Sequence, residues 1–309
     1  MRPRRLILSV NYNSAEVLEQ CIASVPSNSY DEWLVVDANS TARDEKERLA
    51  SMVTNKVTVR MLKHNRGFGF SVNRGVEELA LSPDDVVWIL NPDTVSNEFT
   101  FERLIYEIEK APLTIVSPVI LDEAGETWFR RGYVDTRSFR VKHALDYRHS
   151  RDRIPFVPGT AIAMTGETWR ITGGFREDLF MYWEDADLCI KAFKQRVALT
   201  VVEHATLIHL EGVSSKSTRS AGRSQLYYYY TARNRIMVAR SHAGPARVWH
   251  WRFILMTLAL LSTPLRKEQA QKLAKFVRCV RGVGAGLAAR IENVEPLRMA
   301  DRNAPKRAR

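Results

Sequence analysis

The chain has 309 residues, of which 45% are hydrophobic and 26% charged, enough for one large domain or two smaller ones with a substantial core. The three cysteines, Cys21, Cys189 and Cys279, lie far apart without a CxxC pair, which argues against a disulfide framework or a cysteine zinc site and favours a reducing compartment. Much of the net charge of +11 lies in residues 266–309, which hold 12 Lys/Arg and 4 Asp/Glu. This excess of positive charge predicts an anionic partner, which is membrane lipid, a phosphate-bearing acceptor or nucleic acid.

The first 121 residues alternate apolar, β-rich runs with segments of helical character. The runs lack a clean polar–apolar alternation, which is typical of strands buried on both faces. Their spacing of roughly 25 residues favours β-α-β units in a mostly parallel sheet. The first run is too short for a signal peptide and no cleavage site follows it. The predicted strands are residues 5–10, 32–40, 56–63, 86–94 and 114–121.

Three of these strands end in turns that are rich in Asn and Asp, at residues 11–13, 37–39 and 91–93. In open α/β sheets, ligands bind outside the carboxyl ends of the strands. We therefore expect a pocket at this edge of the sheet. The alternative is that the Asn and Asp side chains only cap the turns.

The second half of the chain continues the mixture of strands and helices. Residues 122–156 are irregular and predict loops or a small subsidiary sheet. Buried strands are expected at 157–165 and 197–212, and helices at 167–175, which glycines end, 184–196 and 224–243.

The motif WEDADL at residues 183–188 gathers three carboxylates, Glu184, Asp185 and Asp187, in a basic chain. They fall in the first turn of a predicted helix, where the helix dipole favours negative charge. The alternatives are that they only begin this helix, that they hold a metal, or that one of them accepts a proton. Aromatic residues just before the motif predict an apolar wall that raises the pKa of such a base by desolvation.

Residues 247–266 form a short apolar helix flanked by Trp, Arg and Lys. Its apolar run, 253–261, is too short to span a bilayer, which takes about 20 residues. The flanking residues are typical of a helix that lies in the membrane interface. A core helix of the C-terminal segment is the alternative.

Five segments, in order, resemble the inverting family 2 glycosyltransferases, and most closely their rhamnosyltransferase-like branch of bacterial surface-polysaccharide synthesis. They are SVNYNS, VVDANS, HNRGFGFSVNRG, ILNPDT and PGTAIAMTGETWRITGGFREDLFMYWEDADLC, and the resemblance covers about residues 5–240. Each segment alone is a weak signal, but their common order makes the resemblance specific.

The resemblance implies an α/β GT-A fold, with a Rossmann-like, mostly parallel nucleotide-binding sheet and helices on both faces. Residues 1–240 would form the glycosyltransferase domain, with a nucleotide-sugar half at 1–121 and an acceptor and catalytic half at 122–240. Residues 241–309 would form a basic, helical extension that associates with the membrane.

The resemblance also implies roles for individual residues. Asp185 would be the general base and Glu184 would bind acceptor hydroxyls, because an inverting transfer needs only one base. Trp183 and Gly174 would lie on the acceptor side. Asp187 caps the helix or forms a salt bridge. The nucleotide sugar would be bound by Asn11, Tyr12, Asp37, Asn65, Gly67, Asn73 and Asn91.

The segment NPDT stands where these enzymes carry an Asp-x-Asp metal motif, with Asn91 in place of the first acid, so that one charge is lost. Asp93 would hold Mg²⁺ or Mn²⁺, which stabilises the charge of the leaving nucleoside diphosphate. His209 would be a second metal ligand or a phosphate contact, and its alternative is a structural histidine that ends a strand.

The expected enzyme moves a sugar, L-rhamnose first, from a nucleotide sugar to a hydroxyl of a saccharide or a polyprenyl-diphosphate-linked acceptor. The donor is dTDP-rhamnose or, alternatively, UDP-hexose or UDP-GlcNAc. We expect a cytoplasmic, peripheral protein at the inner face of the membrane, a tail that touches lipid or pairs subunits as a homodimer, and no nucleic-acid partner. A non-catalytic basic binding protein is the alternative from another class.

Overall fold

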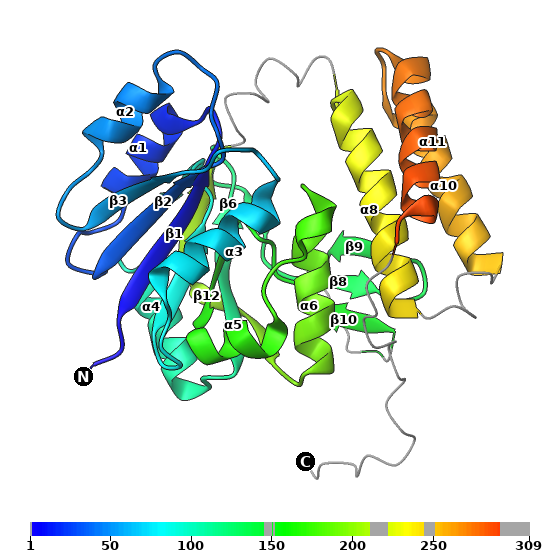
Figure 1. Ribbon diagram of the computed structural model, residues 1–309. Helices are drawn as coiled ribbons and strands as arrows, with labels where there is room; N and C mark the ends of the chain where they lie inside the picture. Colours follow the sequence, from blue (N-terminus) through cyan, green and yellow to red (C-terminus); the bar gives the residue numbers. More distant parts are fainter. Residues whose placement is uncertain (1, 145–149, 151, 211–221, 244–250, 291–309) are drawn as a thin grey trace, which may run out of the picture.

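The computed structural model describes residues 2–144, 150, 152–210, 222–243 and 251–290 (Figure 1). A nine-stranded sheet forms its centre, in the order β3-β2-β1-β4-β11-β6-β12-β5, with β7 paired to β6. The strands are β1 (Arg5–Asn11), β2 (Glu32–Asp37), β3 (Val57–Met61), β4 (Val86–Leu90), β5 (Thr94–Ser96), β6 (Thr114–Leu121), β7 (Thr127–Phe129), β11 (Ala161–Thr165) and β12 (Ala198–His209).

The sheet is mostly parallel, as predicted. Strands β3, β2, β1 and β4 run parallel to one another, and β6 and β12 share their direction. Strand β11 lies between β4 and β6 and is antiparallel to both, while β5 and β7 are short antiparallel additions. The predicted strand at 86–94 is therefore two strands, which the turn at residues 91–93 separates.

Helices pack on this sheet and beside it. The predicted helices at 167–175, 184–196 and 224–243 are confirmed with small shifts of their ends, and Gly173, at φ 70°, ends the first of them. The helices are α1 (Ala15–Ser24), α2 (Glu45–Ser51), α3 (Phe68–Leu79), α4 (Thr100–Lys110), α5 (Gly166–Thr172), α6 (Glu184–Lys194), α8 (Gln225–Ala243), α10 (Trp251–Lys267) and α11 (Lys272–Ala288).

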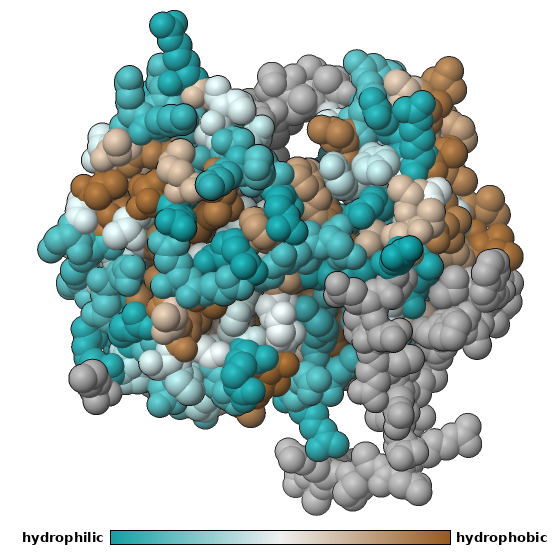
Figure 2. All heavy atoms as spheres, viewed as in Figure 1, coloured by the Kyte–Doolittle hydropathy of each residue, from teal (hydrophilic) through white to brown (hydrophobic). Residues whose placement is uncertain are grey.

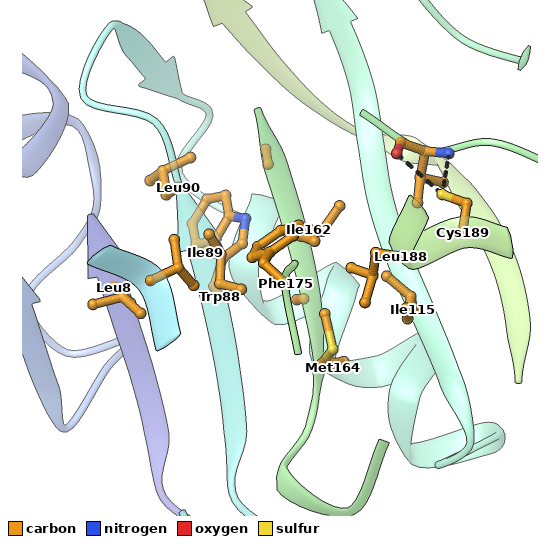
Figure 3. Close-up of a cluster of buried hydrophobic side chains, with 14 of the residues drawn as sticks. Leu8, Trp88, Ile89, Leu90, Ile115, Ile162, Met164, Phe175, Leu188 and Cys189 are labelled. Atoms are coloured by element: carbon orange, nitrogen blue, oxygen red, sulfur yellow. Dashed lines mark hydrogen bonds between the residues drawn. The ribbon is translucent and has the colours of Figure 1, made fainter. Parts of the chain in front are cut away.

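One buried core joins the sheet to the helices that pack on it. Side chains of β1, β4, β11 and β6 belong to the same cluster as Leu188 and Cys189 of α6 (Figure 3). The Cys189 sulfur hydrogen-bonds the backbone N–H and carbonyl of Val157, at 3.5 Å each, and so ties α6 to the chain just before β11. Trp88 of β4 stacks on Phe101 of α4, with ring centroids 5.0 Å apart. This packing holds the first turn of α6 at a fixed place beside the sheet.

A small second sheet confirms the subsidiary sheet expected in the irregular segment. It has the order β10-β8-β9, from β8 (Gly132–Asp135), β9 (Arg140–His143) and β10 (Arg153–Pro155). It lies between α6 and α8 in Figure 1.

The helices α8, α10 and α11 form a layer at one side of the molecule (Figure 1). A buried cluster joins them: Glu268 accepts hydrogen bonds from Tyr228, at 2.8 Å, and from Lys275, at 2.5 Å. Within the residues described, no helix is long and apolar enough to cross a membrane. The tail from residue 291 and the start of the predicted helix, 247–250, lie outside the described residues.

Candidate active site

A cavity of about 1040 Å³ lies between the carboxyl end of the sheet and the α8–α10 layer. Asn91 and His209 line it from the sheet, and Glu184 and Asp185 from the first turn of α6. The opposite wall comes from α8 and from residues 259–267 of α10. The predicted pocket at this edge of the sheet is therefore present, and two of the three WEDADL acids, Glu184 and Asp185, line it.

A strained segment brings these acids to the cavity. Phe180, Tyr182 and Trp183 have left-handed backbones, with φ of 64°, 66° and 76°. For residues other than glycine, such conformations cost about 1–3 kcal/mol each and persist only where the surroundings hold them. Trp183 is the N-cap of α6, so the turn sets how the helix begins.

Asn234 of α8 holds this segment in place. Its side chain is fully buried, and its amide nitrogen donates to the carbonyls of Leu179, Met181 and Tyr182 at 2.6–2.9 Å. In the sequence, Asn234 stands between Arg233 and Arg235, and nothing there indicates that it contacts residues 179–182.

Gly67 supports the same segment from α3. The Phe68 N–H donates to the Phe180 carbonyl at 2.8 Å, and a Cβ on Gly67 would lie 2.1 Å from that carbonyl oxygen. With a φ of 99°, residue 67 also needs the freedom of glycine. The structure thus gives Gly67 a packing role beside the nucleotide-binding role that the resemblance implies. The Gly67 N–H donates to the Asn65 side-chain oxygen at 2.9 Å.

The two acids that line the cavity have unusual electrostatics. Burial, and then the charge of Asp185, raises the pKa of Glu184 to about 8. Burial also raises the pKa of Asp185, although the N–H groups of Gly159, at 3.3 Å, and Ala186, at 2.7 Å, favour its ionised form. Glu184 Oε2 is buried and accepts no hydrogen bond from any residue that the structure describes. The geometry therefore favours a protonated Glu184 beside an ionised Asp185 near neutral pH.

Asp187, the third acid of WEDADL, does not line the cavity. It is 1% exposed and ties α6 to α8: its carboxylate lies 2.7 Å from His242 Nε2 and 3.3 Å from Lys191 Nζ. Its pKa is lowered because the hydrogen bond from His242 and the charges of Lys191, His242 and Arg176 outweigh the effect of burial. The prediction of a salt bridge for Asp187 is confirmed.

On the sheet side, Asp93 and His209 come together as predicted, with Asp93 Oδ2 3.3 Å from His209 Nε2. Strands β5 and β12 pair at Thr94 and His209, which brings together two residues more than 100 positions apart in the chain. Asn91 Oδ1, Asp93 Oδ1 and His209 Nδ1 are buried and have no hydrogen-bond partner within the part of the chain that the structure describes. Unpaired buried polar atoms are costly unless a ligand completes them.

These donors fit a divalent cation that also takes oxygens from a diphosphate. Mg²⁺ and Mn²⁺ prefer oxygen ligands, and Mg²⁺ usually keeps several waters, so a carboxylate and an amide oxygen are enough protein ligands. A cage of three or more His, Cys, Asp or Glu side chains does not occur among the residues described. The donor set thus suits an ion shared with a substrate.

Asn11 and Asp37 meet at the carboxyl ends of β1 and β2. The Asn11 side chain donates to Asp37 at 2.8 Å and to Glu45 at 3.0 Å, and Ser40 donates to Asp37 through both its N–H and its hydroxyl. Glu45 was not anticipated, because it lies in a helical segment that carries no motif. Tyr12 stands beside this network with 47% of its surface exposed.

Asn73 and Gly174 lie together at the far side of α3. The Asn73 amide nitrogen donates to the Phe175 carbonyl at 2.8 Å, and its oxygen accepts from the Phe175 N–H at 3.0 Å. A Cβ on Gly174 would lie 2.8 Å from the Trp169 ring. Both residues hold the turn that leads toward α6, and they lie outside the residues that line the cavity.

Several cavity residues were not singled out from the sequence. Thr160 accepts from the Asn91 N–H at 2.8 Å and so fixes the turn that carries Asp93. An aromatic wall stands beside His209, whose ring meets that of Trp128 edge to face at 5.2 Å. His143 and Phe156 extend this wall. Trp128, His143 and Phe156 come from the irregular segment 122–156, where the sequence carries no periodic signal.

The chain is similar in sequence and in structure to known glycosyltransferases. The sequence model of glycosyl transferase family 2 matches residues 7–167, about half of the chain, and the protein belongs to this family. It is a glycosyltransferase of the hexosyltransferase class, which settles the expectation of an enzyme over a non-catalytic binding protein.

Two curated relatives are similar at low identity. One is the dTDP-rhamnosyl transferase RfbF of Shigella flexneri, 21% identical over 69% of this chain and 72% of its own. The other is the low-salt glycan biosynthesis hexosyltransferase Agl10 of Haloferax volcanii, 24% identical over 76% of this chain and 75% of its own.

Solved structures share the fold. GalNAc-T7, solved with UDP, GalNAc and Mn²⁺, aligns over 89% of this chain with a TM-score of 0.63 and 18% identity, and this chain spans 53% of its length. The mannosyltransferase PcManGT of Pyrobaculum calidifontis, solved with GDP-Man and Mn²⁺, aligns over 93% of this chain and 88% of its own with a TM-score of 0.57 and 14% identity. The GT-A fold is therefore confirmed.

Proposed function

We propose that the protein is an inverting glycosyltransferase that moves a sugar from a nucleoside-diphosphate sugar to a hydroxyl of a saccharide or lipid-linked saccharide. The observation that carries this proposal is the environment of the Asp185 carboxylate. It lines the cavity, accepts hydrogen bonds from two backbone N–H groups, and lies next to Glu184, whose pKa is raised. L-Rhamnose, from dTDP-rhamnose, is the first donor to test, since one relative is a dTDP-rhamnosyl transferase. UDP-hexose and UDP-GlcNAc are the alternatives.

In the proposed reaction, Asp185 takes the proton of the acceptor hydroxyl as its oxygen attacks the anomeric carbon. The bond from that carbon to the donor phosphate breaks on the opposite face, and the nucleoside diphosphate leaves. One base suffices, because no glycosyl-enzyme forms. Glu184, protonated near neutral pH, donates a hydrogen bond to an acceptor hydroxyl, and Trp183 flanks the acceptor sugar.

The donor would lie along the carboxyl ends of β1, β2 and β4. Asn11 and Asp37 present a fixed polar network to the base and ribose, Tyr12 offers an exposed ring, and Asn91 lies toward the sugar. Gly67 and Asn65 would bring the N-terminus of α3 close to the donor. Asn73 and Gly174 would affect donor binding indirectly, by holding the turn that leads toward α6.

The donor diphosphate would lie beside Asp93 and His209. A Mg²⁺ or Mn²⁺ ion held there with Asn91 would offset the charge that develops on the leaving diphosphate. The unpartnered oxygens of Asp93 and Asn91 support this assignment.

The proposal extends to the whole protein. Residues 1–121 would form the nucleotide-sugar half and residues 122–240 the acceptor half, with 241–309 as a basic extension. A polyprenyl-diphosphate-linked acceptor would place the enzyme at the cytoplasmic face of a membrane. Exposed apolar side chains on α10 and α11 support contact with lipid or with a second copy of the chain.

Calorimetric titration with dTDP- and UDP-sugars, with and without Mn²⁺, tests this function. We expect metal-dependent binding that Asp93→Ala weakens, and turnover that Asp185→Asn lowers by about 10²–10⁴-fold. Leu113→Ser, at an exposed site before β6, is a control for handling and folding. A folded protein that binds no nucleotide sugar would refute the proposal, and metal-independent binding would move the leaving-group role to arginine or histidine.

A further inference from the structure

We infer that the part of the cavity next to α8 and α10 binds a phosphate group of the acceptor. This inference rests on the proposed function and deepens it, because it names the chemistry of the acceptor and the residues that recognise it. We call this part the basic arm. It is formed by Arg140, Lys142, Arg223, Arg235, Arg266 and Lys267.

The charges of the cavity are sharply divided. Its only acids among the described residues are Glu184 and Asp185, at the α6 end, whereas all six Lys and Arg side chains that line it belong to the basic arm. These cations come from β9, from α8 and the residues just before it, and from the end of α10. Among the residues described, none of the six forms a salt bridge with a carboxylate. A pocket with this charge attracts an anion.

Arg235 is the strongest evidence for a ligand. The residue is 6% exposed, yet among the described residues its guanidinium makes one hydrogen bond, from NH2 to the Ser138 carbonyl at 2.7 Å, and its buried Nε has no partner there. Burial, and then the nearby charge of Arg140, lower the pKa of Arg235 to about 9, although the charge of Asp135 acts in the opposite direction. A buried cation that lacks a paired anion is unfavourable. A bound phosphate would supply both the missing acceptor and the missing charge.

The position of Arg235 assigns this phosphate to the acceptor. Its guanidinium lies 5.9 Å from the centre of the Trp183 ring, and Trp183 directly precedes the acids of α6. The proposed site for the donor diphosphate, at Asp93 and His209, comes instead from the β4–β5 turn and the end of β12. An acceptor that reaches Asp185 with its hydroxyl would thus extend its phosphate into the basic arm.

The walls also indicate what accompanies the phosphate. Ala259, Leu260, Ser262 and Thr263 of α10 line the arm between its cations. The same helix carries the exposed apolar residues Ile254, Leu255 and Leu258. A phosphate joined to an apolar chain would use both features. A phosphorylated sugar without a chain would use only the cations.

The test is a titration of protein that is already saturated with nucleoside diphosphate and Mn²⁺, so that the donor site is filled. Farnesyl diphosphate is the lipid probe, farnesol its uncharged counterpart, and glucose 1-phosphate the probe without a lipid. We expect farnesyl diphosphate to bind and farnesol to bind at least tenfold more weakly. Arg235→Gln should weaken the diphosphate about 10–100-fold, the usual range for a hydrogen bond to a charged group, while Arg235→Lys should retain part of the affinity.

Arg281→Gln is the matched control, since Arg281 is an exposed arginine of α11 outside the cavity lining. If Arg235→Gln unfolds the protein, Arg266→Gln with Lys267→Gln tests the exposed end of the arm, and the same loss is expected. Unchanged binding of farnesyl diphosphate in the folded variants would overturn the inference. So would a loss of nucleotide affinity in Arg235→Gln that equals the loss for farnesyl diphosphate, because the arm would then serve the donor.

Glucose 1-phosphate that binds with the same dependence on Arg235 would identify a phosphorylated sugar as the source of the phosphate. The titrations are repeated without nucleotide. If the protein binds no nucleotide but still binds the phosphate probe in a way that needs Arg235, the phosphate site is supported and the proposed transferase function fails. The two failures are therefore distinguishable.

Discussion

At the scale of single residues, the proposed reaction depends on two neighbouring carboxyl groups, Glu184 and Asp185, that share a half-buried site. Their difference comes from backbone contacts: Asp185 accepts hydrogen bonds from two N–H groups, whereas the buried Oε2 of Glu184 has no partner among the described residues. Hydrogen bonds to the charged form favour ionisation, and burial without them opposes it. Two adjacent acids thus acquire different roles from their surroundings.

The raised pKa of Glu184 predicts how stability depends on pH. Its folded pKa, about 8, lies above the ordinary value of 4.5. Between these values the unfolded chain releases a proton that the folded protein keeps, so Glu184 stabilises the fold below about pH 4.5 and this contribution is lost as pH rises to about 8. We expect the melting temperature of Glu184→Gln, relative to wild type, to rise across this window.

Thermal melts at half-unit steps from pH 4.5 to 8.5 measure this difference. Glu167→Gln is the control, because the pKa of this exposed carboxyl is lowered by Arg170, so its effect has no upward trend in the same window. A flat difference between Glu184→Gln and wild type would show that Glu184 titrates normally.

The buried side-chain amide of Asn234 holds the segment that positions the proposed base, Asp185. Replacing it with alanine removes three hydrogen bonds to the segment whose strained residues precede α6. Since misplacement of a reacting group by about 1 Å can reduce rates by about 10²-fold, we expect Asn234→Ala to lower kcat by about that factor. Donor affinity should change little, because the nucleotide site lies across the sheet edge.

Steady-state kinetics with donor calorimetry separates these effects, at a temperature well below the melting point of the variant. Asn97→Ala, in the loop before α4, is a matched amide control. Equal losses in kcat and donor affinity would indicate general unfolding, and an unchanged kcat would contradict a positioning role.

At the scale of elements, α6 is fixed to α8 by one buried ionic cluster. Asp187 meets His242 and Lys191, and the Arg176 guanidinium lies 3.9 Å away. Asp187→Asn would leave these groups without their anion in a site that is almost closed to water. Breaking a buried pair in this way costs about 3–5 kcal/mol, so the free energy of unfolding should fall by about that amount.

Urea denaturation at pH 7 measures this loss. Asp178→Asn is the comparison, because Asp178 pairs with the same Arg176 from a partly exposed position and should change stability by at most about 1 kcal/mol. Similar effects of the two variants would mean that the buried cluster contributes no more than a surface pair.

At the scale of the whole molecule, the α10–α11 layer presents apolar side chains to solvent along its outer edge (Figure 2). Ile254, Leu255 and Leu258 of α10 are each more than half exposed, and Leu273 of α11 is 72% exposed. Exposed Lys and Arg stand among them. Apolar side chains interspersed with cations are typical of a surface that contacts anionic lipid.

Co-sedimentation with phosphatidylglycerol vesicles tests this contact. We expect binding that weakens as salt rises and that the triple change Ile254→Ser, Leu255→Ser, Leu258→Ser largely abolishes, since burying each such side chain contributes about 1.5–3 kcal/mol. Leu226→Ser, at an exposed leucine near the start of α8, is the control. No binding by wild type at low salt would refute lipid contact, and a dimer that the triple change dissociates would show that the surface pairs two chains.

Local sequence determined much of this protein. The apolar runs predicted the strands, because β-branched and aliphatic residues suit a backbone buried on both faces. WEDADL lay in the first turn of a helix, and the aromatic residues before it predicted the direction of the Asp185 pKa shift. The Asn/Asp turns predicted a pocket at the carboxyl ends of the strands, since strand ends of one direction meet at one edge of a sheet. Of these turns, the one after β4 reaches the cavity through Asn91, whereas the turns after β1 and β2 lie outside the cavity lining.

Only the tertiary structure decided which distant side chains meet. The insertion of β11 between β4 and β6 and the hydrogen bonds from Asn234 to residues 179–182 join residues 47 or more positions apart. That Nε of Arg235 lacks a hydrogen-bond partner among the described residues is likewise decided by the packing. Periodicity and turn chemistry report the conformation of neighbouring residues, whereas such contacts depend on how whole elements pack. The sequence therefore identified the acids of the site, and the packing of α6 against α8 and the sheet determined their environment.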